Sequence, residues 1–173
     1  MPVLATSPRV LTVQIPWEAG LGNQTLTIEN PSDGAAAFSA PPHTLFLREE
    51  APQILPAALH PAFDQLVTEA NPARAGQYVH LYMTGLGAVS PPVRTGQPAP
   101  SSPLAELAAP LRCGIGTPSH EVFWAGLAPG LVGLYQADIG IPADATTQRA
   151  SIVCRTAKGA TASTVLPVVG ANR

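Results

Sequence analysis

Apolar and polar residues alternate along several short segments of the chain, with the two-residue period of a β-strand. In VLTVQIP (10–16), three apolar residues share one face and a proline ends the run. The alternation is clearest in QYVHLYMTG (77–85), where both faces are largely apolar, as in a strand at the centre of a sandwich. Further strands are predicted in the segments 24–30, 37–47, 110–116, 120–126, 130–142 and 149–169.

Proline is unusually frequent, with 20 residues among 173, and glycine contributes another 15. Because proline cannot donate a backbone hydrogen bond and breaks helix interiors, few uninterrupted windows of three helical turns are left. A short helix at 64–70 is one reading of the region 51–77. The prolines around it favour a short strand, a turn and another short strand instead. We therefore expect an all-β fold with long loops.

An internal repeat relates the two ends of the chain. Residues 13–39 and 139–164 each contain a strand, an Ile-Pro pair, a polar connector, an alternating strand, a glycine-containing turn and another strand. Only the second copy has a long run of predicted strands before it. The sequence thus predicts an incomplete sandwich of about three strands at 1–50, the back half of a repeat, and a complete sandwich at 51–173.

Three strands cannot close a two-sheet core alone. We therefore expect the first 50 residues to be packed on the second domain, completed by another chain, or completed by a missing N-terminal segment of a larger protein.

Four motifs carry a resemblance to a known family: VQIPWE, NPARAGQYVHLYMTGLGAVSPPVRTGQPAPSSPLA, VFWAGLAPGLVGLYQADIGIP and STVLPV, which together span about residues 10–169. The chain resembles the C-terminal β-sandwich domain of secreted acidobacterial (Solibacter-type) proteins. The resemblance implies an Ig-like sandwich similar to IPT/TIG domains, placed near the end of an exported protein. It implies no catalytic residues. It also implies further sequence before the VQIPWE segment, which would supply the first strands of that sandwich.

Charge and hydropathy exclude several classes of function. Charged residues make up 12% of the chain, and 9 Lys and Arg against 11 Asp and Glu give a net charge of −2. No basic cluster of five or more residues is present to neutralise a phosphate backbone, which argues against nucleic-acid binding. No apolar run of about 18 residues predicts a membrane span. The N-terminal residues lack the basic start and apolar stretch of a signal peptide.

Catalytic motifs are not evident. The histidines His43, His60, His80 and His120 occur in no HxH or HExxH pattern, and no GxSxG elbow accompanies them. His80 alternates with Tyr78 and Tyr82 and is interpreted as a structural histidine on a sheet face. The acidic residues are scattered over strand ends and turns, which is typical of solvated surface. We expect no catalytic residue, no metal site and no cofactor.

Two tryptophans are candidate ligand-stacking residues. Carbohydrate-binding sandwiches stack sugar rings on exposed aromatic side chains, and Trp17 and Trp124 could serve in this way. Trp17 follows a strand-ending proline, and Trp124 is adjacent to Phe123, so one of that pair faces outward if both lie in a strand. The competing interpretation is packing in the core or between domains.

The two cysteines, Cys113 and Cys154, lie on predicted strands that an Ig-like topology would place side by side or across the core. A disulfide suits an exported domain. Two buried free thiols are the alternative.

The stretch 84–110 is rich in proline, glycine and serine, as a linker between domains would be. Both of its flanks nevertheless belong to the predicted second sandwich. We therefore expect an ordered crossing inside one domain that covers a sheet edge otherwise open to pairing.

These observations predict a non-enzymatic structural or interaction module of an exported bacterial protein, secreted or at the cell surface. Its partner would be a protein or a glycan. One alternative is a carbohydrate-binding β-sandwich, and another is a small hydrolase with a loop-borne active site.

Overall fold

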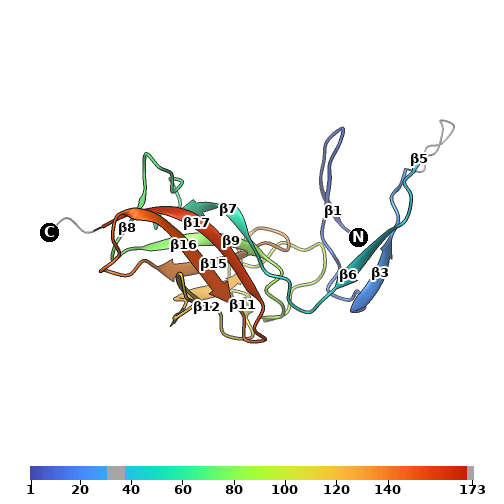
Figure 1. Ribbon diagram of the computed structural model, residues 1–173. Coiled ribbons are helices and arrows are strands. Elements are labelled where there is room, and N and C mark those ends of the chain that lie inside the picture. Colours follow the sequence, from blue (N-terminus) through green and yellow to red (C-terminus); the bar gives the residue numbers. More distant parts are fainter. Residues whose placement is uncertain (31–37, 171–173) are drawn as a thin grey trace. The chain divides into compact units, whose positions relative to one another are not determined.

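The computed structural model describes residues 1–30 and 38–170 (Figure 1). These residues form strands, turns and loops without a helix, so the prediction of an all-β fold is confirmed. No helix long and apolar enough to cross a membrane occurs within these two ranges. The chain divides into two compact units: the first joins Met1–Trp17 to Glu50–Arg173, and the second is Glu18–Glu49.

The first unit contains a six-stranded antiparallel sheet. Its third to sixth strands, β14, β15, β9 and β7, are the long ones, and β7 carries a register shift between Ile54 and Ala58. The strands are, in spatial order, β10 (Val89–Ser90), β11 (Glu106–Leu107), β14 (Trp124–Leu127), β15 (Tyr135–Gly140), β9 (Tyr78–Thr84) and β7 (Gln53–Leu59).

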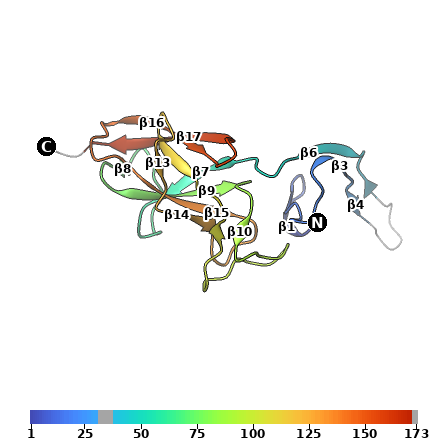
Figure 2. The ribbon, with the colours of Figure 1, turned by 90° about the horizontal axis from the view of Figure 1, so that it is seen from below.

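A five-stranded sheet packs against the first to make a β-sandwich. Figure 2 shows the two layers, with β16 and β17 in one and β14 and β15 in the other. The end strand β8 runs parallel to β17, and the other pairs are antiparallel. In spatial order the strands are β13 (His120–Glu121), β12 (Arg112–Ile115), β16 (Gln148–Arg155), β17 (Thr161–Val169) and β8 (Ala73–Arg74).

The strand order is that of an immunoglobulin-like sandwich. Such a fold places strands A, B, E and D in one sheet and strands C, F and G in the other. Here β7, β9, β15 and β14 occupy the A, B, E and D positions, while β12, β16 and β17 occupy C, F and G. The expected fold class is therefore confirmed for this part of the chain.

Alternating residues of both sheets build the core. On β9, Val79, Leu81 and Met83 are buried, as the sequence period predicts. Tyr135 begins β15 inside the sandwich and donates a hydrogen bond from its hydroxyl to the carbonyl oxygen of Gly87. From the facing sheet, the buried side chains are Ala150, Ile152, Cys154, Leu166 and Val168. Each large side chain contributes about 1.5–3 kcal/mol by leaving water.

The proline-rich stretch 84–110 is part of the sandwich. Its strands β10 and β11 pair with each other, and β11 adds to the edge of β14. Two of its own residues, Ala99 and Ala105, are buried. The stretch therefore occupies an edge of the six-stranded sheet, as a crossing between the B and C positions.

One predicted strand is divided between the two sheets. The segment 120–126 was expected to be continuous, but β13 ends at Glu121 in one sheet and β14 begins at Trp124 in the other. The chain changes layers at residues 122–123. Periodicity cannot reveal such a change, because both short pieces are extended.

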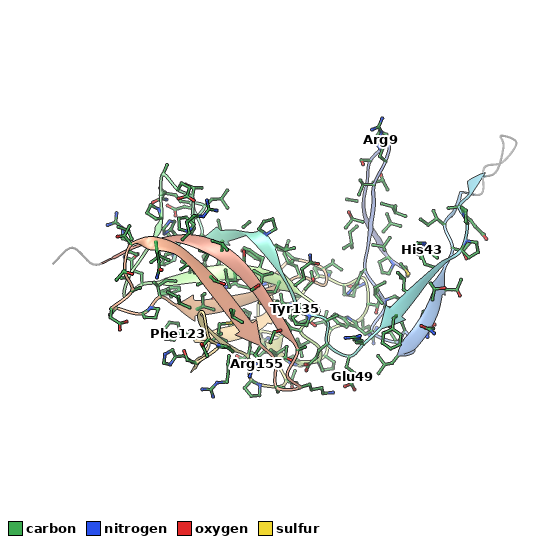
Figure 3. All side chains as sticks on the ribbon, viewed as in Figure 1. Arg9, His43, Glu49, Phe123, Tyr135 and Arg155 are labelled. Carbon is green, nitrogen blue, oxygen red and sulfur yellow. A yellow bond between two sulfur atoms is a disulfide. The ribbon has the colours of Figure 1, made fainter. Side chains whose placement is uncertain are left out.

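Residues 1–17 form a hairpin of β1 (Val3–Thr6) and β2 (Leu11–Val13), whose tip carries Arg9 (Figure 3). The side-chain Oε1 of Gln14 accepts a hydrogen bond from the backbone N–H of Gly96 at 2.7 Å. The backbone N–H of Trp17 donates to the Thr95 hydroxyl at 2.9 Å. These contacts with the proline-rich stretch place the hairpin in the first unit. Residues 1–50, expected as one domain, are thus divided between the two units.

The second unit is a hairpin interrupted near Pro41 and Pro42. Strand β3 (Gly22–Leu26) pairs with β6 (His43–Leu47), and β4 (Glu29–Asn30) pairs with β5 (Phe38–Ser39). In residues 18–29 and 40–49 no side chain is buried. The turn expected at 31–34 lies outside the described residues.

Candidate functional site

Polar and aromatic side chains gather on the outer face of the six-stranded sheet, over strands β9 and β15. The core residues of β9 point inward, so Tyr78, His80 and Tyr82 point outward. The antiparallel register places His80 opposite Asp138 and Tyr78 opposite Gly140. Two strands separated by more than 50 residues thus bring a histidine and a carboxylate together.

His80 is 2% exposed and has a partner at each ring nitrogen. Its Nδ1 lies 2.6 Å from Oδ1 of Asp138, and its Nε2 lies 3.2 Å from the carbonyl oxygen of Pro61. The side-chain amide of Gln136 also donates to Oδ1 of Asp138, at 2.8 Å. The carboxylate of Asp138 and the carbonyl of Pro61 therefore hold the imidazole from both sides.

Phe63 covers this pair. Its ring lies nearly parallel to the imidazole of His80, with the centroids 3.6 Å apart and the planes 14° apart. Its backbone φ is +59°, the left-handed region that a bulky residue rarely adopts. Such a conformation costs about 1–3 kcal/mol and persists where the surroundings hold it. The ring face of Phe63 that points away from His80 is exposed to solvent, and the residue is 50% exposed.

Two more aromatic rings extend the array along the sheet. Tyr78 meets His80 edge-on at 5.4 Å, and Phe123 meets Tyr78 edge-on at 6.3 Å. The absence of a side chain at Gly140 makes room for this, because a Cβ there would lie 3.1 Å from the Phe123 ring. We call Phe63, His80, Tyr78 and Phe123 the aromatic row.

Tyr82 stands beside the same carboxylate on β9. Burial raises the pKa of its hydroxyl, and the negative charge of Asp138 raises it further. The neutral phenol is therefore the form present next to Asp138. This adds a polar hydroxyl at the other end of the outward face of β9.

A pocket of about 340 Å³ opens at the Phe123 end of the row. It lies where the chain changes layers, and its wall is mostly apolar. Its size is in the range of small-molecule sites. The lining residues are Val122, Phe123, Ile139, Gly140, Ile141 and Pro142, with Cys113 and His120.

Of the two tryptophans predicted to stack ligands, Trp124 shares the outer face of the sheet with the row, because it is the register partner of Asp138, whereas Trp17 lies outside the six-stranded sheet. The exposed Trp17 meets the core residue Tyr135 edge-on at 6.4 Å. Trp124 is half-buried on β14, and its ring lies over Gly126, where a Cβ would come within 2.7 Å of it. Its indole Nε1 is buried without a hydrogen-bond partner. Of the adjacent pair, Phe123 is the more exposed, at 74%.

Cys113 and Cys154 are joined by a disulfide. They are register partners on the neighbouring strands β12 and β16. Of the two geometries expected from the sequence, the bond takes the one within a sheet. Both residues are buried, so the link lies against the core and next to the pocket.

The other histidines do not join the row. The Nε2 of His60 lies 3.1 Å from the carbonyl oxygen of Asn71, within the loop that carries Phe63. His43 is on β6 and His120 is on β13. Among the residues that the structure describes, no group of three His, Cys, Asp or Glu side chains is placed to hold a metal ion.

Part of this site follows from the sequence. The outward direction of Tyr78, His80 and Tyr82 follows from the period of β9. The pairing of His80 with Asp138 depends on which strands are neighbours and on their register. The local sequence of β9 or of β15 specifies neither. Phe63 carried no signal in the sequence, because it lies in a loop without periodicity.

Comparisons with protein-family models, curated proteins and solved structures gave no match for the chain.

Proposed function

We propose that the chain is a non-enzymatic structural and interaction module of an exported bacterial protein, secreted or held at the cell surface. Its sandwich is the folded body, and the hairpin of the second unit docks onto another β-sheet. The observation that carries the proposal is a comparison of two hairpins. The hairpin of the second unit has the same strand register as the β16–β17 hairpin of the sandwich, but its inward side chains are not buried.

The two hairpins match in the spacing of their inward positions. In the sandwich, Ala150 and Ile152 of β16 alternate with exposed residues, and Leu166 is the register partner of Ala150. In the second unit, Gln24 and Leu26 alternate in the same way, and Leu45 is the register partner of Gln24. Strand β3 therefore corresponds to β16 within the repeat seen in the sequence, and its partner β6 follows the end of that repeat.

The two hairpins differ in how far their inward side chains are buried. Ile152, Leu166 and Val168 are buried beneath the opposite sheet. Leu26, Leu45 and Leu47, at the matching positions, are only half-buried. An isolated two-stranded hairpin is at best marginally stable in water. A β-sheet of a neighbouring module, from the same polypeptide or from another chain, would cover these positions and satisfy the strand edges.

The hydrolase alternative finds less support. His80 and Asp138 form a histidine–carboxylate pair, as a catalytic triad requires. However, the second ring nitrogen of His80 is held by the carbonyl oxygen of Pro61, and Phe63 covers the ring. A general base needs that nitrogen to face a nucleophile. The pair therefore fits a structural role better.

Hydrogen exchange of the dilute chain tests the docking hairpin. We expect the amides of β3 and β6 to exchange far faster than those of β16 and β17, because the side chains of β3 and β6 are at most half-buried. We also expect Leu45→Lys to leave the melting midpoint, followed by tryptophan fluorescence, within about 2 °C of the parent, whereas Leu166→Ala lowers it by about 5–15 °C. Val165→Lys, on the exposed face of β17, is the matched charge control.

Equal protection of the two hairpins, or a loss of stability in Leu45→Lys as large as in Leu166→Ala, would contradict the proposal. Either result would mean that the hairpin is already covered within this chain.

A further inference from the structure

Three aromatic side chains of the row are exposed on one face of a rigid sheet. Phe63 is 50% exposed, Tyr78 is 38% exposed and Phe123 is 74% exposed. They come from the loop after β7, from β9 and from the junction before β14, and are linked through His80 by ring contacts. Exposed apolar rings scattered singly need no explanation, but a connected array marks a binding surface.

The array is held in place before any ligand arrives. His80, beneath Phe63, is fixed by hydrogen bonds at both ring nitrogens. Phe123 lies against the bare backbone of Gly140. Rigid aromatic side chains lose little conformational entropy on binding, so a prearranged row retains more of its contact energy.

Polar groups border these rings. Asp138, whose side chain is 19% exposed, lies between the strands that carry the row. Tyr78 is exposed and brings a phenolic hydroxyl, which both donates and accepts hydrogen bonds. A few fixed polar groups within an aromatic surface are the usual means of orienting a small polar ligand.

An uncharged sugar matches this combination. One face of a pyranose ring presents C–H groups, which pack on an aromatic face, while its rim of hydroxyls donates to a carboxylate or a phenol. A purely apolar peptide would cover Asp138 without replacing its contact with water, which is costly. A phosphate-bearing ligand would meet the carboxylate of Asp138 in a chain with a net charge of −2.

We propose that the aromatic row binds an uncharged oligosaccharide of pyranose units, with sugar rings on Phe63 and Phe123 and hydroxyls toward Asp138 and Tyr78. The pocket of about 340 Å³ beside Phe123 receives the end of the sugar chain. This site lies wholly within the first unit and is independent of the docking hairpin, so each proposal is tested by its own variants.

Isothermal titration of the full chain with cellohexaose, xylohexaose and chitohexaose tests the site. We expect binding of at least one of the three. Phe123→Ala should then weaken it about tenfold, the loss typical of one stacking partner. The matched control is Phe46→Ala, which removes an aromatic side chain that is 62% exposed on β6, outside the row. It should leave the affinity unchanged.

A second variant separates recognition from folding. Phe63→Ala should weaken the same oligosaccharide while the circular dichroism spectrum of the sandwich is retained. The proposal is overturned if none of the three oligosaccharides binds. It is also overturned if Phe46→Ala weakens binding as much as Phe123→Ala, or if the row binds an apolar, proline-rich peptide in place of every sugar.

Discussion

The hairpin of the second unit and the β16–β17 hairpin of the sandwich share one local pattern of residues and strand pairing. Both alternate inward and outward residues, and both pair in the same relative register. In the sandwich the inward side chains are buried. In the second unit no side chain of residues 18–29 and 40–49 is buried. Local sequence pattern therefore sets the strand pairing in both hairpins, while burial comes only from a second sheet.

This difference has an energetic consequence. The hydrophobic contribution of a side chain scales with the apolar area that leaves water. The same residue type should therefore matter greatly in one hairpin and little in the other. The sandwich hairpin is also linked to β12 by the disulfide.

The largest expected effect compares Ile152→Ala with Leu26→Ala. Ile152 is buried, so its truncation should lower the free energy of unfolding by about 2–5 kcal/mol. Leu26 is half-buried, and its truncation should cost less than about 1 kcal/mol. Urea unfolding followed by tryptophan fluorescence reports the first unit, to which Trp17 and Trp124 belong, and far-ultraviolet circular dichroism follows the strands of both units. Similar losses in the two variants would remove the distinction between the hairpins.

The second prediction concerns the disulfide. It closes a loop with a sequence separation of 41 residues. Replacement of both cysteines by alanine should destabilise the sandwich by about 2–4 kcal/mol, because the unfolded chain gains freedom. A free-thiol assay of the denatured, unreduced protein should titrate no thiol. Two titrated thiols would show that the bond is not formed.

The smallest effect is a loss of stability at high pH. Burial raises the pKa of the Tyr135 hydroxyl well above its ordinary value of 10.0. Below about pH 10 the hydroxyl is protonated in both folded and unfolded chains, so its contribution to stability is complete. As the pH rises further, the unfolded chain loses this proton first and stability falls by about 1.4 kcal/mol per pH unit. Chemical unfolding between pH 8 and pH 11.5 checks this.

Tyr135→Phe is the control for that pH dependence, because it removes the proton while keeping the ring. Its unfolding free energy should fall less steeply above pH 10 than that of the parent. An identical slope would assign the loss to other groups.

The fold was predictable where the evidence is local. The alternation in 77–85 identified β9 and the direction of its side chains, and the proline content excluded long helices. The layer change at residues 122–123 was not predictable, because an extended segment has the same period in either sheet. The exposure of Phe123 follows from that change, so the most exposed ring of the site could not be read from its neighbours in the sequence.

The sequence by itself determined the all-β class, the inward faces of the main strands and the repeat between the two ends of the chain, because these depend on residues close together in the chain. Only the tertiary structure decided that His80 meets Asp138, that Cys113 bonds Cys154 within one sheet, and that Phe63 closes over the pair. Each of these depends on which strands become neighbours and in which register. That choice is made by burial across the whole sandwich, and the hairpin of the second unit shows the same local pattern without such burial.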